Sequence, residues 1–210
     1  MLDKLDEIQK RKKGLKSEYQ ELALVTDSTS QSLVYIDKWL NSKDDKLIAT
    51  ATSFIDELGA IKPDLCTRFT GSLLELITNK SNRIVWGSLT ALESYADLIH
   101  DKLYNNFNLI INALENGSVV AKDHVVQILQ KLSKYDQYYK DCIVIMIEQI
   151  RVCAPNQLGQ YSERCFDVIK QEDADDFMES LRLRFAGLDN HHHVRRIQNL
   201  LDLTSKKFNK

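Results

Sequence analysis

The sequence is poor in the residues that build tight turns and disulfide frameworks. Only seven glycines and two prolines occur among 210 residues, which argues against a turn-rich β-sandwich or barrel and favours helices. The four cysteines, Cys66, Cys142, Cys153 and Cys165, have no CxxC spacing and lie within apolar helical patterns. We therefore expect buried, reduced thiols rather than disulfides or a zinc site. A chain of this length buries a sizeable core without such staples.

Long apolar runs and an excess of either charge are also missing. The first residues, MLDKLDEIQKRKKG, are charged from the third position, and no run of about 18 apolar residues occurs, so neither a signal peptide nor a membrane span is predicted. We expect a cytoplasmic protein without a membrane partner. Its 28 Lys and Arg against 30 Asp and Glu give a net charge of −2, which provides no overall electrostatic attraction to nucleic acid.

Apolar residues instead recur with a period of 37. Positions 36, 73, 110 and 147 are Ile, Leu, Ile and Ile, and positions 55, 92, 129 and 166 are Ile, Leu, Leu and Phe. Within each period the apolar residues are three or four apart, as on one face of a helix. Two such helices joined by a short link form a hairpin, and stacked hairpins bury a continuous core that one hairpin cannot bury alone.

The period predicts an all-α fold in a single helical-repeat domain over residues 1–210. Five hairpin units are expected at about 1–45, 46–82, 83–119, 120–156 and 157–189, followed by a terminal helix at 192–204. A polar column at positions 27, 64, 101, 138 and 175 reads Asp, Asp, Asp, Tyr and Asp, which we interpret as N-caps of the second helices. Glu18, Glu21 and Arg184 occupy otherwise apolar columns, as expected where terminal repeats present a polar outer face.

Two segments carry a family resemblance. WLNSKDDKLIATATSFIDELG and LITNKSNRIVWGSLTALESYADL resemble the link and first helix of HEAT repeats. The resemblance implies an α-α superhelix, or solenoid, of about five HEAT-like hairpins with a terminal capping helix. HEAT first helices often contain a proline that these segments lack, so an armadillo-like or an irregular hairpin stack stays open. The repeat signature carries no reactive group and therefore predicts architecture rather than chemistry.

Catalytic and metal-binding motifs are scarce. The chain has no GxSxG, HExxH or glycine-rich phosphate loop, so we predict no catalytic residues, no cofactor and no enzyme; a DNA glycosylase on a HEAT-like scaffold is the enzymatic alternative. His191, His192 and His193 are adjacent, and neighbours on a helix point about 100° apart, whereas helical zinc ligands are four apart. We place them in a loop or the first turn of the terminal helix, with Asn190 as a cap, and keep opportunistic metal binding as the alternative.

The second helices of such hairpins line the concave face of the stack, so we expect a protein partner there. At the 37-residue offset, positions 72, 109, 146 and 183 are Ser, Leu, Met and Leu, which is an apolar column for a solvent face and suits an extended peptide or a helix. The alternative is that neighbouring helices bury this column. The predicted partner-binding residues are Asn105, Leu109, Asn112, Met146, Gln149 and Leu183.

A basic C-terminal end supports a second function, binding nucleic acid in the manner of a HEAT-like DNA-repair protein. Its predicted phosphate contacts are Arg182, Arg184, Arg195 and Arg196. Four acidic residues lie close by in the sequence, Glu172, Asp173, Asp175 and Asp176, and their charge favours an ordinary solvated face. The identity of the partner, the oligomeric state and the packing of the first 20 residues are left open by the sequence.

Overall fold

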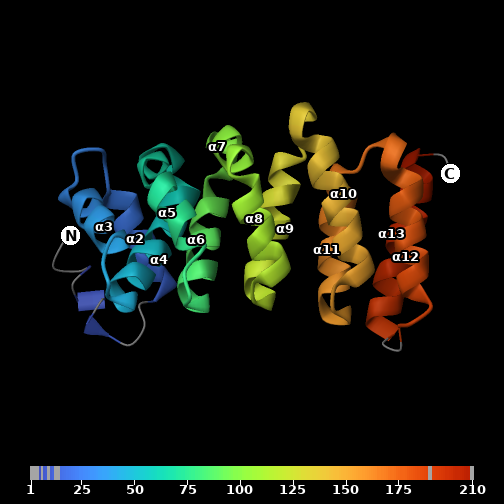
Figure 1. The fold of residues 1–210 in the computed structure, drawn as a ribbon, viewed down its shortest axis with the longest axis horizontal. Coiled ribbons are helices and arrows are strands. Elements are labelled where there is room, and N and C mark those ends of the chain that lie inside the picture. Colours follow the sequence, from blue (N-terminus) through green and yellow to red (C-terminus); the bar gives the residue numbers. More distant parts are fainter. Residues whose placement is uncertain (1–4, 6, 9, 12–14, 189–190, 209–210) are drawn as a thin grey trace. The chain divides into compact units, whose positions relative to one another are not determined.

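The computed structural model describes residues 5, 7, 8, 10, 11, 15–188 and 191–208, and these residues form helices joined by short links, with no β-strand among them (Figure 1). In this part of the chain no helix is both long and apolar enough to span a bilayer. Two compact units make up the chain, residues 1–125 and residues 126–210. The boundary falls within helix α9.

The first unit consists of short and medium helices. Its elements are α2 (Lys16–Val25), α3 (Gln31–Leu40), α4 (Asp45–Ile61), η1 (Pro63–Phe69), α5 (Thr70–Leu76), α6 (Asn82–Ser94), η2 (Ala96–Leu98), α7 (His100–Asn105), α8 (Phe107–Asn116) and the first half of α9 (Val119–Leu132). Before α2, the side chains of Leu5 and Ile8 are both 1% exposed. The start of the chain therefore contributes to the core of this unit.

The second unit contains longer helices. They are the remainder of α9, α10 (Asp136–Val152), α11 (Pro155–Val168), η3 (Gln171–Asp173), α12 (Ala174–Phe185) and α13 (His191–Phe208). Helix α10 packs on α12, and α11 packs on α13. The terminal helix expected at 192–204 is thus present and extends four residues further.

The helix starts follow the repeat in the sequence. Helices α4, α6, α9 and α11 begin at residues 45, 82, 119 and 155, close to the 37-residue period, and each is followed by the second helical segment of its hairpin. The predicted core columns are buried except at Phe166, which is only partly buried: Ile36, Leu73 and Ile110 are 0% exposed, as are Ile55 and Leu92. The apolar stripes read from the sequence therefore do face the core.

The cysteines behave as small apolar residues. All four are buried and none is in a disulfide, as the sequence predicts. Burial raises the pKa of the Cys66 and Cys142 thiols to about 12, because the thiolate is poorly solvated inside the core. At neutral pH these thiols are protonated, and protonated thiols are poor nucleophiles and metal ligands.

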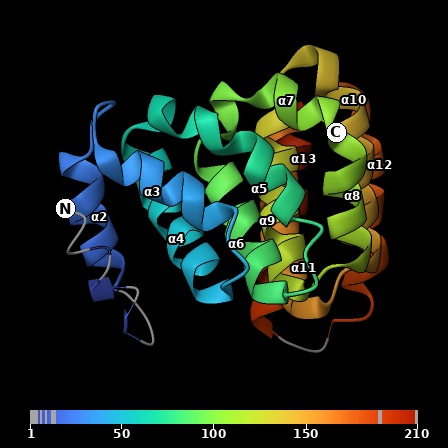
Figure 2. The same cartoon turned by 60° about the vertical axis from the view of Figure 1, so that its left-hand side comes forward.

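Helices α4 and α6 run side by side in the same direction and approach each other very closely (Figure 2). Two glycines allow this approach. A β-carbon on Gly87 would stand 2.7 Å from the Thr52 hydroxyl, and one on Gly59 would stand 2.0 Å from the Ser94 hydroxyl. Residues 52 and 59 face residues 87 and 94, so the two helices are parallel and equivalent positions of the repeat are offset by about two residues.

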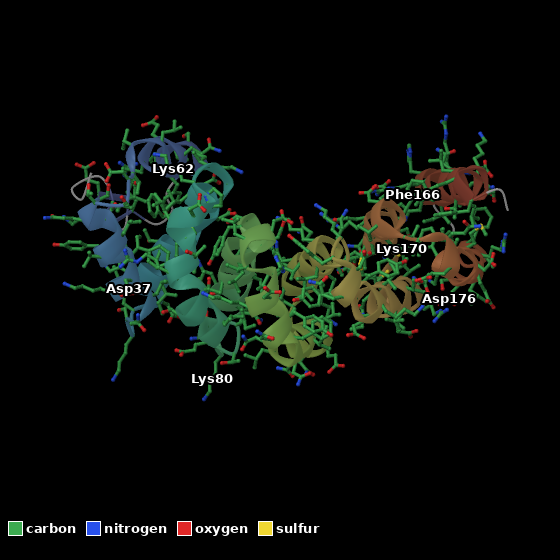
Figure 3. All side chains as sticks on the ribbon, turned by 90° about the horizontal axis from the view of Figure 1, so that it is seen from above. Asp37, Lys62, Lys80, Phe166, Lys170 and Asp176 are labelled. Atoms are coloured by element: carbon green, nitrogen blue, oxygen red, sulfur yellow. The ribbon has the colours of Figure 1, made fainter. Side chains whose placement is uncertain are left out.

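Helix α2 is fastened to the end of α4. The ammonium group of Lys62 donates hydrogen bonds to the backbone carbonyls of Leu24 and Thr26, each at 2.6 Å (Figure 3). These carbonyls lie at the C-terminal end of α2, where a helix has no internal donors left for its last oxygens. The contact therefore holds α2 beside α4, and α4 lies between α2 and α6.

The predicted N-cap column is wrong in its details. Asp27 accepts hydrogen bonds from the backbone of Thr29 and the hydroxyl of Ser30, so it organises the turn before α3, whose N-cap is Ser30. Asp64, Asp101 and Asp175 lie in first helical turns, and the N-caps of their helices make no side-chain capping bond. Their carboxylates are placed to interact with the helix dipole, which is favourable without a specific cap.

Candidate functional site

A pocket of about 930 Å³ lies on the first helices of the first unit. Residues of α2, α4 and α6 line it, together with Ile8 and Arg11. Small side chains make the hollow, because Ala49 and Ser53 on α4 and Gly87 on α6 leave space where larger residues would fill the surface. The close approach of α4 and α6 holds the two helices together beneath this space.

The lining residues of α4 and α6 are equivalent positions of the repeat. They follow an i, i+3, i+4, i+7 spacing, which places them on one face of each helix. The pocket is therefore built from two copies of the same stripe, one copy on each helix. The equivalent pairs are Lys46 and Arg83, Ala49 and Trp86, Thr50 and Gly87, and Ser53 and Thr90.

Lys46 and Arg83 form the cationic end of the pocket. Each lies in the first turn of its helix, and both are exposed. Neither forms an ion pair with any carboxylate among the residues that the structure describes. The N-terminus of α4 is capped by Asp44, which accepts a hydrogen bond from the Lys46 backbone N–H at 2.8 Å, so the positive charge at this end of the pocket comes from the two basic side chains.

The carboxylates of the pocket lie further along α4. Glu57 is only 7% exposed and pairs with the ammonium group of Lys16 at 3.3 Å. The neighbouring Asp56 is half-buried, and burial raises its pKa to about 6, with a further increase from the charge of Glu57. Both effects disfavour a second negative charge at this position.

Two aromatic rings complete the walls. Trp86 is 39% exposed, which is high for so large an apolar residue. Tyr19 is 7% exposed and shares a hydrogen bond with Thr50, and burial raises the pKa of its phenol. Tyrosine and tryptophan offer broad, rigid contact surfaces, which is why they are enriched where proteins bind other molecules.

Beyond Trp86, three polar side chains connect α6 with α9. The Thr90 hydroxyl is 2.9 Å from Nε2 of His124, and Nδ1 of His124 is 2.8 Å from the Glu93 carboxylate. A hydroxyl, an imidazole and a carboxylate in this order resemble a nucleophilic triad. However, the Thr90 hydroxyl donates to the Trp86 carbonyl at 2.8 Å, so its only proton is already used within the helix.

The surroundings of Thr90 also lack the donors that acyl transfer requires. Thr90 lies inside α6, where backbone N–H groups are bonded to carbonyls of the preceding turn and cannot stabilise an oxyanion. The three side chains therefore act as a polar connection between successive first helices. A similar connection occurs in the second unit, where Gln130 contacts both Arg164 and Asp167 at 3.0 Å.

The partner-binding residues predicted from the sequence are divided between the two units. In the first unit Asn105 and Asn112 are exposed and Leu109 is partly exposed. In the second unit Gln149 is partly exposed and Leu183 is exposed. The prediction of an exposed Met146 is wrong, because this side chain is 1% exposed. Its sulfur lies 3.7 Å from the Ser133 hydroxyl, so neighbouring helices bury this member of the column.

Two of the four predicted phosphate contacts already have partners within the fold. The Arg184 guanidinium donates to the carbonyls of Arg151 and Cys153 at 2.6 and 2.8 Å, and thereby caps the end of α10 instead of forming a polar outer face. The Arg196 side chain packs over Gly159 of α11, where there is no β-carbon in its way, and its guanidinium donates two hydrogen bonds to the Glu163 carboxylate. Arg182 and Arg195 are both exposed.

The three histidines begin the terminal helix. Helix α13 starts at His191, which confirms their predicted place in its first turn, whereas Asn190 lies outside the described residues. No group of three or more His, Cys, Asp or Glu side chains suited to a metal ion occurs in the described ranges.

The polar columns of the repeat carry a signal for the pocket that its apolar columns do not. Positions 46 and 83 are both basic, positions 53 and 90 are both hydroxyl residues, and positions 56 and 93 are both acidic. These polar columns lie on the first helices, whereas the predicted partner surface lies on the second helices. Small residues at 49, 53 and 87 between charged ones were the sign of a hollow.

Comparison with known proteins extends these observations. No known protein family matches the sequence, and no curated protein matches it. Among solved structures, an engineered protein is 11% identical and covers 98% of this chain and 96% of its own, with a TM-score of 0.65. Computationally designed armadillo repeat proteins for modular peptide recognition are 12% identical, with coverages of 96% and 97% and a TM-score of 0.62.

A further structure is a designed armadillo repeat protein in complex with the peptide (KR)4. It is 13% identical, with coverages of 96% of this chain and 90% of its own and a TM-score of 0.67. At such low identity these likenesses concern the fold alone. They confirm the all-α helical-repeat fold, of the HEAT and armadillo type, that the sequence predicts.

Proposed function

We propose that the protein is a non-enzymatic interaction module that binds an extended segment of a partner protein in the pocket of the first unit. The observation that carries this proposal is the pocket itself: about 930 Å³ of space whose walls carry an exposed tryptophan and two cations that form no ion pair with any described residue. Concave sites of this size, with apolar walls and a few convergent polar groups, are the usual form of binding sites.

The fold supports the choice of a peptide as ligand. Equivalent positions recur on neighbouring parallel helices, with similar side chains at 46 and 83 and at 53 and 90, so an extended chain that crosses the helices meets partly repeated groups. Structural neighbours of the protein were designed for modular peptide recognition, and one of them holds a peptide. A cytoplasmic location, expected from the sequence, belongs to the same proposal because none of the four cysteines is in a disulfide, as is usual in a reducing compartment.

The second helices provide alternative surfaces for the same function. One such surface in the first unit contains Asn105, Leu109 and Asn112, and another in the second unit contains Gln149 and Leu183, while Met146 belongs to neither because it is buried. Both surfaces stay predictions. Among the residues that the structure describes, no observation favours the nucleic-acid alternative, since Arg184 and Arg196 are bonded within the second unit.

Selection of peptides from a displayed random library on the immobilised full chain tests the function. Peptides that are enriched are synthesised with a fluorescent label, and their affinities are measured by anisotropy. Trp86→Ala is expected to weaken binding by about tenfold or more, because aromatic anchors dominate binding energy, while Leu109→Glu leaves it unchanged. The opposite pattern would place the site on the second helices, and a library without enriched peptides would contradict the function.

A further inference from the structure

We infer that the pocket selects acidic segments of its partner, with one carboxylate held between Lys46 and Arg83 and a neighbouring apolar side chain packed on Trp86. This inference rests on the proposed function, which it deepens by assigning a chemical class to the ligand. Three independent features of the pocket carry it: the balance of its charges, the spacing of its two helices and the exposed indole.

The charge balance of the pocket differs from that of the chain. The whole chain carries a net charge of −2, whereas basic residues outnumber acidic ones along the pocket. A pocket of this composition attracts anions and raises their local concentration. The basic lining residues are Arg11, Lys16, Lys46 and Arg83, and the acidic ones are Asp56 and Glu57.

Ion pairs neutralise the other basic residues of the pocket and leave the excess positive charge at the end that contains Lys46 and Arg83. Arg11 pairs with Glu18, and Lys16 pairs with Glu57. Lys46 and Arg83 have no carboxylate partner within the described ranges, so their interaction with an incoming anion would replace only water.

The carboxylates, by contrast, are poorly placed to receive a basic segment. Glu57 is buried and already bonded to Lys16, and Glu93 is bonded to His124. Asp56 is half-buried, with Lys16 close enough to affect its charge. An incoming cation would have to displace Lys16 or enter beside it. At Lys46 and Arg83 an incoming anion has no ion pair to break among the described residues, because the nearby Asp44 carboxylate is used as the N-cap of α4.

Helix spacing brings the two cations to one point. Lys46 and Arg83 are equivalent in the repeat, and the contacts at Gly87 and Gly59 show that α4 and α6 are parallel, with equivalent positions offset by about two residues. Packed helices are usually about 8–10 Å apart, and glycine contacts bring them closer than that. Side chains as long as lysine and arginine can span half of this separation, so both can contact the same carboxylate.

Trp86 defines the neighbouring subsite. It lies one helical turn after Arg83, and its counterpart on α4 is the small Ala49, so the space in front of the indole is not filled by an equivalent side chain. The indole is 39% exposed in the absence of a ligand. An apolar side chain next to the acidic residue would cover this ring and gain contact area on both sides.

Three fluorescein-labelled peptides test the inference with the full chain. They share a central leucine and differ only in the flanking residues, which are glutamate, glutamine or lysine. The glutamate peptide is expected to bind about tenfold or more tightly than the glutamine peptide at about 50 mM salt, because close charge pairs contribute strongly when water is partly excluded. Most of this advantage should be lost at about 500 mM salt, where screening is severe.

A double variant with a matched control locates the effect. Lys46→Gln with Arg83→Gln is expected to give the glutamate and glutamine peptides equal affinity. Lys43→Gln with Lys80→Gln removes the same charge from another equivalent pair, which is exposed and does not line the pocket; Lys80 lies at the outer edge of the first unit (Figure 3). This control is expected to keep the preference. Thermal unfolding by circular dichroism confirms that both variants are folded.

The possible results separate the inference from the proposed function. If a library peptide binds and Trp86→Ala weakens it, but the glutamate peptide has no advantage or the lysine peptide binds best, the function stands and the inference is wrong. An equal loss of preference in both double variants also overturns it. If labelled single-stranded DNA binds more tightly than the glutamate peptide and needs Lys46 and Arg83, the ligand is a phosphate polymer, and the inference is again wrong.

Discussion

Gly59 of α4 lies directly against Ser94 of α6, so closely that a β-carbon on Gly59 would stand 2.0 Å from the Ser94 hydroxyl. Real side chains do not tolerate such a distance. This contact and the one between Gly87 and Thr52 set the separation of the two helices that form the floor of the pocket. The shape of the pocket therefore depends on two positions without side chains.

Replacing Gly59 by alanine is expected to lower the free energy of unfolding by about 1–3 kcal/mol, because overpacking forces the helices apart. Urea unfolding followed by circular dichroism measures the loss. Ser94→Gly in the same chain should recover part of it, because the nearest obstacle is the Ser94 side chain. Gly71→Ala is the control: no atom lies within 4 Å of its β-carbon, and this exposed helical site should gain up to about 1 kcal/mol. Equal losses at the two sites would contradict the close approach.

Lys16→Ala is expected to destabilise the fold although Lys16 is itself exposed. Its removal leaves the carboxylate of Glu57, which is 7% exposed, without its partner. A loss of about 1–2 kcal/mol is expected, between the values for surface and for fully buried pairs. Adding Glu57→Gln should restore most of the stability, since a neutral amide is less costly to bury. If the double variant is less stable than Lys16→Ala alone, the pair does not have this role.

The raised pKa of Asp56 predicts that the stability of the fold depends on pH. Burial raises its pKa from 3.8 to about 6, so the folded protein binds this proton more tightly than the unfolded chain does. Its contribution to stability is therefore greatest below about pH 4, decreases as the pH rises to about 6, and is constant above that. Asp56→Asn should be more stable than the parent at about pH 7.5 by on the order of 1–3 kcal/mol, with no difference at about pH 3.5.

The comparison of parent and variant isolates Asp56 from its neighbours. Glu57, Lys16, Glu93 and His124 all act on its charge, and they are present in both proteins, so their own titrations largely cancel in the difference. Urea unfolding at a series of pH values gives this difference directly. A difference that does not change between about pH 4 and about pH 6 would show that Asp56 is well solvated.

Arg184→Met should destabilise the second unit, because the guanidinium caps the carbonyls of Arg151 and Cys153 at the end of α10. A loss of about 1.5–3 kcal/mol is expected for hydrogen bonds to a charged group. Arg182→Met on the same helix is the control, since Arg182 is exposed, and its effect should be within about 0.5 kcal/mol. A phosphate-binding role for Arg184 would instead leave stability unchanged and reduce affinity for DNA.

The fold could be predicted from the sequence because each hairpin buries the same columns. Ile36, Leu73 and Ile110 recur every 37 residues and all are fully buried, so one period was enough to place the helices. The period predicts whether the residues of a column are usually buried or exposed, but not the burial of each single residue. Met146 shows the limit: its column includes the exposed Leu183, yet Met146 itself is covered by neighbouring helices.

The pocket could not be located from the apolar pattern, because it results from small side chains at positions where larger ones would fill the surface. Its floor depends on the close approach at Gly59 and Gly87, and one wall is provided by Ile8 and Arg11, which precede the first complete hairpin. These are tertiary contacts between segments far apart in the sequence. The pairing of equivalent lysine and arginine at positions 46 and 83 was visible in the sequence, but its meaning depends on the space between them.

Fluorescence of Trp86 on peptide binding tests the central proposal most directly. The chain has two tryptophans, and Trp39 is 8% exposed, so Trp39→Phe leaves Trp86 as the only indole at a modest structural cost. On titration with a peptide from the library, emission from Trp86 is expected to shift to shorter wavelength, because the ligand displaces water from the ring. The shift should saturate with the dissociation constant measured by anisotropy. A peptide that binds the Trp39→Phe variant and leaves Trp86 emission unchanged would contradict the proposed pocket.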